Sequence, residues 1–130
     1  MKSIAALSAL LIAPLLLSTL PAHASGLQGT WRGAGYLKPS SGKRVRVSCV
    51  VRYSRHTARV FAVSANCASN SGNVRQTGEV LKIRANTYVG DFYNRQFDIR
   101  GRVRVRIRGG RQTVTFSSSS GGGSVSLKKR

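Results

Sequence analysis

Apolar and polar residues alternate along almost the whole chain after residue 25, and no segment carries a sustained helical repeat. The clearest alternation runs over 99–108, where odd positions hold aliphatic residues or glycine and every even position holds arginine. Successive side chains of a strand point to opposite faces, so a half-buried antiparallel strand separates two such sets cleanly. The pattern predicts a strand with an outward row of arginines.

Clusters of Gly, Pro, Asn and Ser divide the rest of the chain into further short segments of this kind. The predicted strands cover about 29–37, 43–53, 59–67, 74–83, 87–93, 97–108, 112–117 and 124–128. Gly109-Gly110 suits a two-residue hairpin turn, since both positions can take positive φ. The Ser and Gly run 117–123 suits a flexible hairpin loop.

Short connections of this kind place strands that are neighbours in sequence side by side. Closing such a meander removes its exposed edges and gives the single apolar faces one shared interior. We therefore predict an all-β fold, a single antiparallel up-and-down barrel of about eight strands. A flat open sheet is less favoured because its apolar faces would share no interior.

The first 24 residues have the pattern of a secretory signal peptide. Lys2 precedes an apolar run over 4–17, and Pro21-Ala22-His23-Ala24 ends in the small residues that a signal peptidase needs. The run is short for a membrane anchor, and no cysteine follows the cut to carry a lipid. We expect residues 1–24 to be removed and 25–130 to form a periplasmic or secreted barrel domain without a transmembrane segment.

Cys49 and Cys67 are the only two cysteines. An oxidising compartment favours a disulfide between them. A metal site with two thiolates would need more ligands, and His56 is the only histidine left after cleavage. We predict the disulfide, with no metal and no cofactor.

The chain is strongly basic, with 22 Lys and Arg against 3 Asp and Glu and a formal charge of +19. Most basic groups must therefore take counter-charges from solvent ions or from a partner. The predicted anion-binding residues are Arg100, Arg102, Arg104, Arg106 and Arg108 on one strand, and a second row, Arg44, Arg46 and Arg52, on another. Lys82, Arg84, Lys128 and Arg130 are candidates to extend these rows. Guanidinium groups about 6.5–7 Å apart suit bidentate contacts with the phosphates or carboxylates of a polyanion. A surface that is basic only for solubility or for envelope association is the alternative.

Gly29-Thr30-Trp31 opens the first predicted strand, and Leu127-Lys128-Lys129-Arg130 closes the last. This resembles the calycin pattern, which implies structural roles for Gly29 and Trp31 and a basic side chain from the final strand over the indole. The layout is similar to that of small periplasmic metalloprotease inhibitors, although the chain has a single Trp and far more Arg. It is still more similar to small secreted proteins of Gram-negative bacteria without an assigned activity, through the segments 31–35 and 90–94.

Catalytic chemistry has few candidates. His56 lies beside Arg55, with no carboxylate near it in sequence. We expect Glu79, Asp91 and Asp98 to pair with arginines across strands. Gly33-Ala34-Gly35 lies inside a strand, where it is no phosphate loop, and we expect it to make room for the indole. We predict that the protein is not an enzyme.

We predict a non-enzymatic basic barrel that binds anionic envelope polymers or lipid headgroups, such as lipopolysaccharide phosphates, through its arginine row. The alternative is a periplasmic protease inhibitor that inserts Ser25-Gly26-Leu27-Gln28 into a target cleft. Nucleic acid is disfavoured because the candidate exposed aromatics, Tyr36, Tyr88 and Tyr93, do not interleave with the arginines. An internal apolar ligand is disfavoured because aromatic residues compete for a small lumen, namely Trp31, Tyr53, Phe61, Phe92, Phe97 and Phe116.

Overall fold

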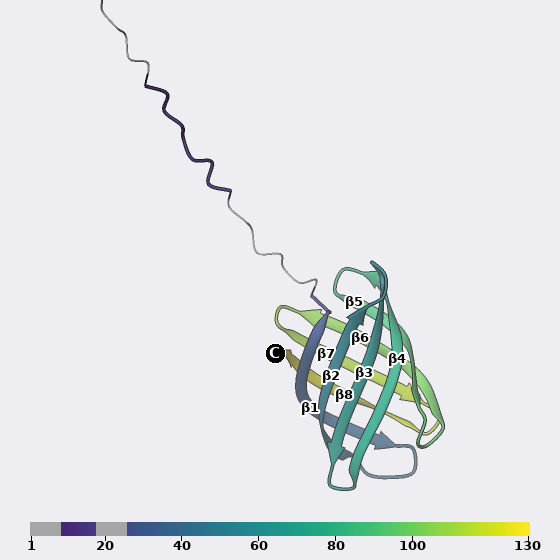
Figure 1. Ribbon diagram of the computed structural model, residues 1–130. Coiled ribbons are helices and arrows are strands. Elements are labelled where there is room, and N and C mark those ends of the chain that lie inside the picture. Colours follow the sequence, from purple (N-terminus) through teal and green to yellow (C-terminus); the bar gives the residue numbers. More distant parts are fainter. Residues whose placement is uncertain (1–8, 18–25) are drawn as a thin grey trace, which may run out of the picture.

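The computed structural model describes residues 9–17 and 26–130. It contains a closed antiparallel barrel in which each strand pairs with its sequence neighbours and β8 pairs with β1 (Figure 1). The strands are β1 (Gly29–Pro39), β2 (Val45–Arg55), β3 (Val60–Ser69), β4 (Gly72–Arg84), β5 (Thr87–Asn94), β6 (Ile99–Arg108), β7 (Arg111–Ser118) and β8 (Gly121–Lys129). The predicted fold class and the predicted order of eight strands are confirmed.

The predicted cleavage point after Ala24 lies outside the described residues. Residues 9–17 are exposed and carry no regular secondary structure. Within the two described ranges, no helix is long and apolar enough to cross a membrane.

The barrel interior is occupied by the inward-facing side chains of the eight strands. Trp31, Phe61, Val105 and Leu127 are almost wholly buried there, because alternate residues of every strand share this one space. The barrel end that holds Trp31, which we call the Trp31 end, carries the β2–β3, β4–β5 and β6–β7 turns and lies uppermost in Figure 1. The chain also finishes there, since the Arg130 N–H donates to the Thr30 carbonyl at 3.0 Å.

One polar pair lies inside this apolar space. Tyr53 donates its hydroxyl hydrogen to Oε1 of Gln112, whose side chain is 2% exposed. Within the described residues, Nε2 of Gln112 has no hydrogen-bond partner. Burial raises the pKa of Tyr53 well above its ordinary value of 10.0.

Cys49 and Cys67 lie directly opposite each other on β2 and β3 and form a disulfide with an S–S distance of 2.02 Å. This confirms the predicted bridge, which joins two strands that are already neighbours in the barrel.

Two predicted element boundaries are wrong. The run 117–123 is no flexible loop, because only Ser119 and Ser120 form the turn and the three glycines 121–123 belong to β8. A Cβ atom on Gly123 would collide with Cζ of Phe116, so glycine leaves room for that ring inside the barrel. Phe97 does not begin a strand either. It precedes β6 in a turn, where its N–H donates to Oδ1 of Asn94 and its side chain is 57% exposed.

The Gly109-Gly110 hairpin turn is present between β6 and β7, but only Gly109 has positive φ, at 61°. A two-residue turn with glycine at its first central position needs positive φ there alone.

Candidate functional site

Five exposed arginines project from the outer face of β6: Arg100, Arg102, Arg104, Arg106 and Arg108. We call this set the arginine ladder. Its inward partners, among them Val105 and Ile107, belong to the buried core. The strict alternation of β6 therefore sets the outward direction of all five guanidinium groups.

The surroundings of the ladder change along its length. At the start of β6, the guanidinium of Arg100 lies 4.8 Å from the ring centre of Tyr93, and Arg102 lies opposite Asp91 on β5. At the other end of the strand, Arg106 lies opposite Thr113, and Arg108 lies opposite Arg111. The positive charge is therefore least compensated near the β6–β7 turn.

Four basic residues form a continuous line across neighbouring strands at this end. Arg108 pairs in register with Arg111, Arg111 with Lys128, and Lys128 with Arg32. We call these four residues the basic row. Like charges directly opposite each other on one face destabilise a sheet, so the row weakens the barrel unless an anion neutralises it.

Two members of the basic row, Arg32 and Arg111, are not among the residues predicted from the sequence. The hairpin turn at Gly109-Gly110 contained a usable signal, because a two-residue turn places Arg108 opposite Arg111. No local signal existed for Arg32, since its pairing with Lys128 depends on closure of the barrel between β1 and β8. Of the four residues expected to extend the arginine rows, Lys128 lies in the basic row on β8, Lys82 and Arg84 belong to β4, and Arg130 follows β8.

An open depression of about 630 Å³ lies over the outer face of β6, β7 and β8. Four cationic side chains line it, those of Arg106, Arg108, Arg111 and Lys128, together with Thr113 and Ser126. Neither β6, β7, β8 nor β1 contains an aspartate or a glutamate. The depression therefore has cationic and hydroxyl groups and no carboxylate from these four strands.

The second predicted row lies on the far side of the barrel. Arg46 and Arg52 belong to β2, which is four strands from β6 in either direction around the closed barrel, and Arg44 directly precedes β2. The guanidinium of Arg44 lies 4.0 Å from the ring centre of Tyr36. The eight predicted arginines thus form two separated surfaces.

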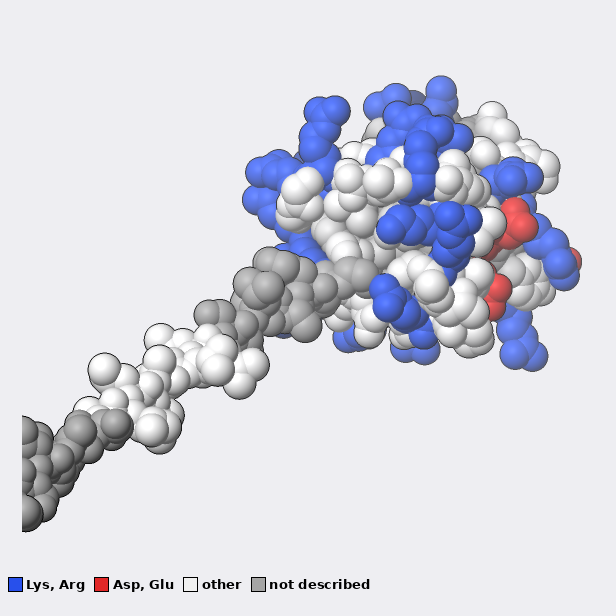
Figure 2. Space-filling model, turned by 90° about the horizontal axis from the view of Figure 1, so that it is seen from above, with Lys and Arg blue, Asp and Glu red and all other residues white. Residues whose placement is uncertain are grey.

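The three acidic residues occupy one side of the molecule. Glu79 and Asp91 lie directly opposite each other on β4 and β5, and Asp98 accepts a hydrogen bond of 3.1 Å from the Tyr93 hydroxyl, which raises the pKa of Tyr93. Figure 2 looks onto the Trp31 end and shows basic side chains on most sides, with the acidic ones gathered on one. The predicted pairing across strands is wrong for Glu79, whose in-register neighbours are Ala62 and Asp91.

The tyrosines differ from their predicted exposure. Tyr88 is buried inside the barrel, where its ring packs edge-on against Phe61 at 5.5 Å. Tyr93 and Tyr36 are half-buried, and each lies against an arginine. Tyr93 therefore adjoins the ladder across strands although it does not interleave with it in sequence.

The Gly-x-Trp segment lies at the barrel end, under the final strand. The indole N–H of Trp31 donates to the Leu27 carbonyl at 2.9 Å, and Nζ of Lys129 lies 5.6 Å from the ring centre. Lys129 also donates to the carbonyl of Gly26, and Leu27 is 0% exposed. Residues 26 and 27 of the proposed inhibitory segment are therefore held against the barrel, and the side chain of Leu27 is part of its core.

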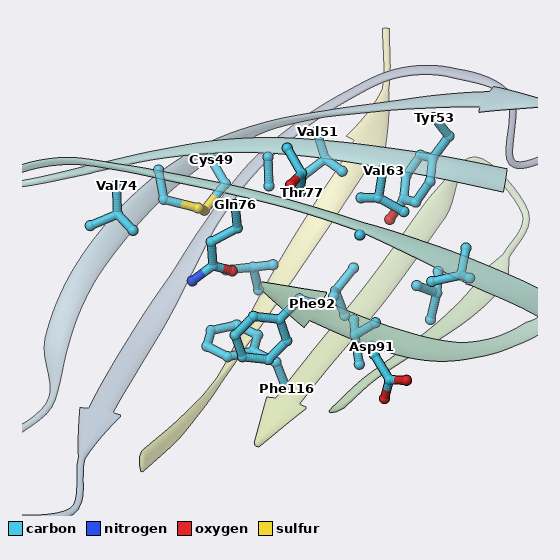
Figure 3. A pocket seen from close by; sticks show the side chains of 18 of the residues that line it. Cys49, Val51, Tyr53, Val63, Val74, Gln76, Thr77, Asp91, Phe92 and Phe116 are labelled. Atoms are coloured by element: carbon cyan, nitrogen blue, oxygen red, sulfur yellow. A yellow bond between two sulfur atoms is a disulfide. The ribbon is translucent and has the colours of Figure 1, made fainter. Parts of the chain in front are cut away.

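The lumen contains an apolar cavity of about 60 Å³ beside the disulfide (Figure 3). Val51, Val63, Phe92 and Phe116 are among its lining residues, and the last two rings pack edge-on at 6.0 Å. Pockets for small organic ligands typically measure about 300–1,000 Å³. This cavity is much smaller than such pockets. Phe97, one of the aromatic residues expected to fill the lumen, lies outside it.

Within residues 9–17 and 26–130, no three His, Cys, Asp or Glu side chains gather in a way that could hold a metal ion. His56 is exposed in the β2–β3 turn.

No protein-family model and no curated protein matches the chain. Among solved structures, it is similar to the redesigned β-barrel mFAP1 bound to DFHBI, with a TM-score of 0.66 and 13% identity over 81% of this chain and 95% of that one. A de novo designed fluorescence-activating β-barrel matches with a TM-score of 0.62 and 17% identity over 82% and 99% of the two chains. Rv2717c from M. tuberculosis matches with a TM-score of 0.57 and 9% identity over 82% and 94%. These similarities show a shared eight-stranded barrel, the architecture that the calycin resemblance implies, and concern the fold alone.

Proposed function

We propose that the protein is an exported, non-enzymatic barrel that binds anionic polymers or lipid headgroups of the cell envelope, such as lipopolysaccharide phosphates. The observation that carries this proposal is the arginine ladder, which leads into the basic row on strands without a carboxylate. The leader pattern at residues 1–24 and the disulfide support a periplasmic or secreted location.

The positive charge of this surface is not compensated by any carboxylate on its own strands. Guanidinium groups on alternate residues of β6 repel one another, and those of Arg108 and Arg111 also lie directly opposite each other. A polyanion removes this repulsion and releases its own condensed counterions, so its affinity falls steeply as salt is raised. Arginine adds bidentate contacts with phosphate that a point charge cannot make.

Elution from lipopolysaccharide and from an anionic matrix in a salt gradient tests the proposal. The ladder variant is Arg102→Ser, Arg104→Ser and Arg106→Ser. The matched control is Arg44→Ser, Arg46→Ser and Arg52→Ser, which removes the same charge from the opposite side of the barrel. We expect the ladder variant to elute at clearly lower salt than the control. Equal shifts would mean that net charge alone drives retention, and a larger shift for the control would move the site to β2.

A further inference from the structure

We propose that the depression on β6, β7 and β8 is a binding site for a single dianionic phosphate group, a phosphomonoester or the terminal phosphate of a diphosphate. The inference deepens the proposed function, because it names the chemical group and the side chains that would hold it.

The site has the form of a grid on the outer face of three adjacent strands. One row contains Arg108, Arg111 and Lys128, and the row beside it contains Arg106, Thr113 and Ser126, each in register with its neighbours. Neighbouring strands lie about 4.8 Å apart, and the two rows are separated by about 6.5–7 Å. Six of the residues that line the depression therefore form a patch of about 10 by 7 Å, over which one phosphate group can contact several of their side chains at once.

The charges of the grid match a dianion. Arg111 has a like-charged side chain in register on both sides, Arg108 on β6 and Lys128 on β8. A group that carries two negative charges relieves both repulsions at once, and a singly charged one relieves them only in part. Since β6, β7 and β8 contain no carboxylate, no internal anion on these strands competes for the site.

The donors of the grid also suit phosphate. Arginine presents paired N–H groups to two phosphate oxygens, and lysine adds a compact charge. Thr113 and Ser126 lie side by side in register and contribute two hydroxyl groups, which can donate to further oxygens. Asn86, in the β4–β5 turn at the edge of the depression, adds an amide.

Other arginines on the barrel lack this convergence. Arg52 on β2 lies opposite Thr30 and Ser64, so it has hydroxyl neighbours and no second cation in register. Arg102 has Ser117 on one side and Asp91 on the other. Arg52 is therefore a control of equal charge and similar exposure.

Binding of inorganic pyrophosphate, measured by calorimetry and by thermal unfolding, tests the inference. Chloride at the same ionic strength serves as the reference anion. We expect pyrophosphate to raise the melting temperature more than chloride does, and Arg111→Ser to weaken its binding by roughly 10- to 100-fold, the effect of losing a hydrogen bond to a charged group. Arg52→Ser should bind as the unchanged protein does. Equal binding by the two variants, or no specific stabilisation by pyrophosphate, would overturn the inference.

Vesicles identify the source of the phosphate. Phosphatidylcholine vesicles that contain phosphatidic acid present a phosphomonoester, and those that contain phosphatidylglycerol at equal surface charge present a phosphodiester. Preference for phosphatidic acid, lost in Arg111→Ser, would support a lipid headgroup as the ligand. Pyrophosphate binding without that preference would support a soluble phosphate compound at the same site. If the ladder variant still loses retention on lipopolysaccharide while Arg111→Ser behaves like Arg52→Ser, the proposed function stands and the phosphate site fails.

Discussion

Replacing Arg111 by serine should stabilise the unliganded barrel at low salt. Arg111 lies in register between Arg108 and Lys128, and cross-strand neighbours on one face have Cβ atoms about 4.5–5.5 Å apart. If the exposed charges spread to ~7 Å in water, each pair repels by about 0.6 kcal/mol. The substitution removes both pairs, so we expect a gain of about 1 kcal/mol, or roughly 4–8 °C in melting temperature for a domain of this size.

The assay is thermal or urea unfolding in phosphate-free buffer at about 0.01 M and about 1 M salt, where the Debye length falls from ~30 Å to ~3 Å. The gain should disappear at the higher salt. Arg52→Ser, whose in-register neighbours are uncharged, should gain much less at either salt. A gain for Arg111→Ser that persists at high salt, or one no larger than that of Arg52→Ser at low salt, would refute the repulsion argument.

Three further predictions concern the barrel itself. Burial raises the pKa of Tyr53 in the folded state. Above about pH 10 the unfolded chain loses the hydroxyl proton while the folded protein keeps it, so stability is intact below about pH 10 and falls above it. Urea unfolding at about pH 9 and about pH 11 should show a smaller fall for Tyr53→Phe, and equal falls would contradict this reasoning. Replacing both disulfide cysteines by alanine should lower the free energy of unfolding by about 3 kcal/mol, measured by urea unfolding; an unchanged midpoint would mean that the bridge does not constrain the unfolded chain. Gly123→Ala should cost about 1–3 kcal/mol because its Cβ would collide with Phe116, whereas Gly110→Ala, which meets nothing within 4 Å, should not. Loss of near-ultraviolet circular dichroism signal and earlier urea unfolding in Gly123→Ala alone would agree with this, and equal stability of the two variants would not.

The strands were predictable because their cause is local. Alternation over 99–108 and the turn at Gly109-Gly110 are properties of neighbouring residues, and together they place β6 and β7 correctly. The boundaries failed where the cause is a specific side-chain contact, which periodicity does not reveal. Gly123 belongs to a strand because the Phe116 ring needs its missing side chain, and Phe97 leaves β6 because Asn94 ties it into a turn.

Some features of the candidate site have local causes that the sequence shows, and others do not. The direction of the arginine ladder follows from the two-residue period of a strand, and the disulfide follows from having only two cysteines. The pairing of Arg32 with Lys128 follows from neither, because those residues are 96 positions apart and meet only when β1 closes on β8.

The sequence by itself determined the all-β class, the number of strands and the outward row of five arginines on β6, because each depends on periodicity and turns within a few residues. The tertiary structure decided which charges share a surface. Closure in sequence order placed β2 on the side opposite β6 and added Arg32 to the line that the β6–β7 and β7–β8 hairpins form from Arg108, Arg111 and Lys128. Side-chain direction is a local property of the backbone, whereas the proximity of charges on strands far apart in sequence depends on closure, which involves the whole chain.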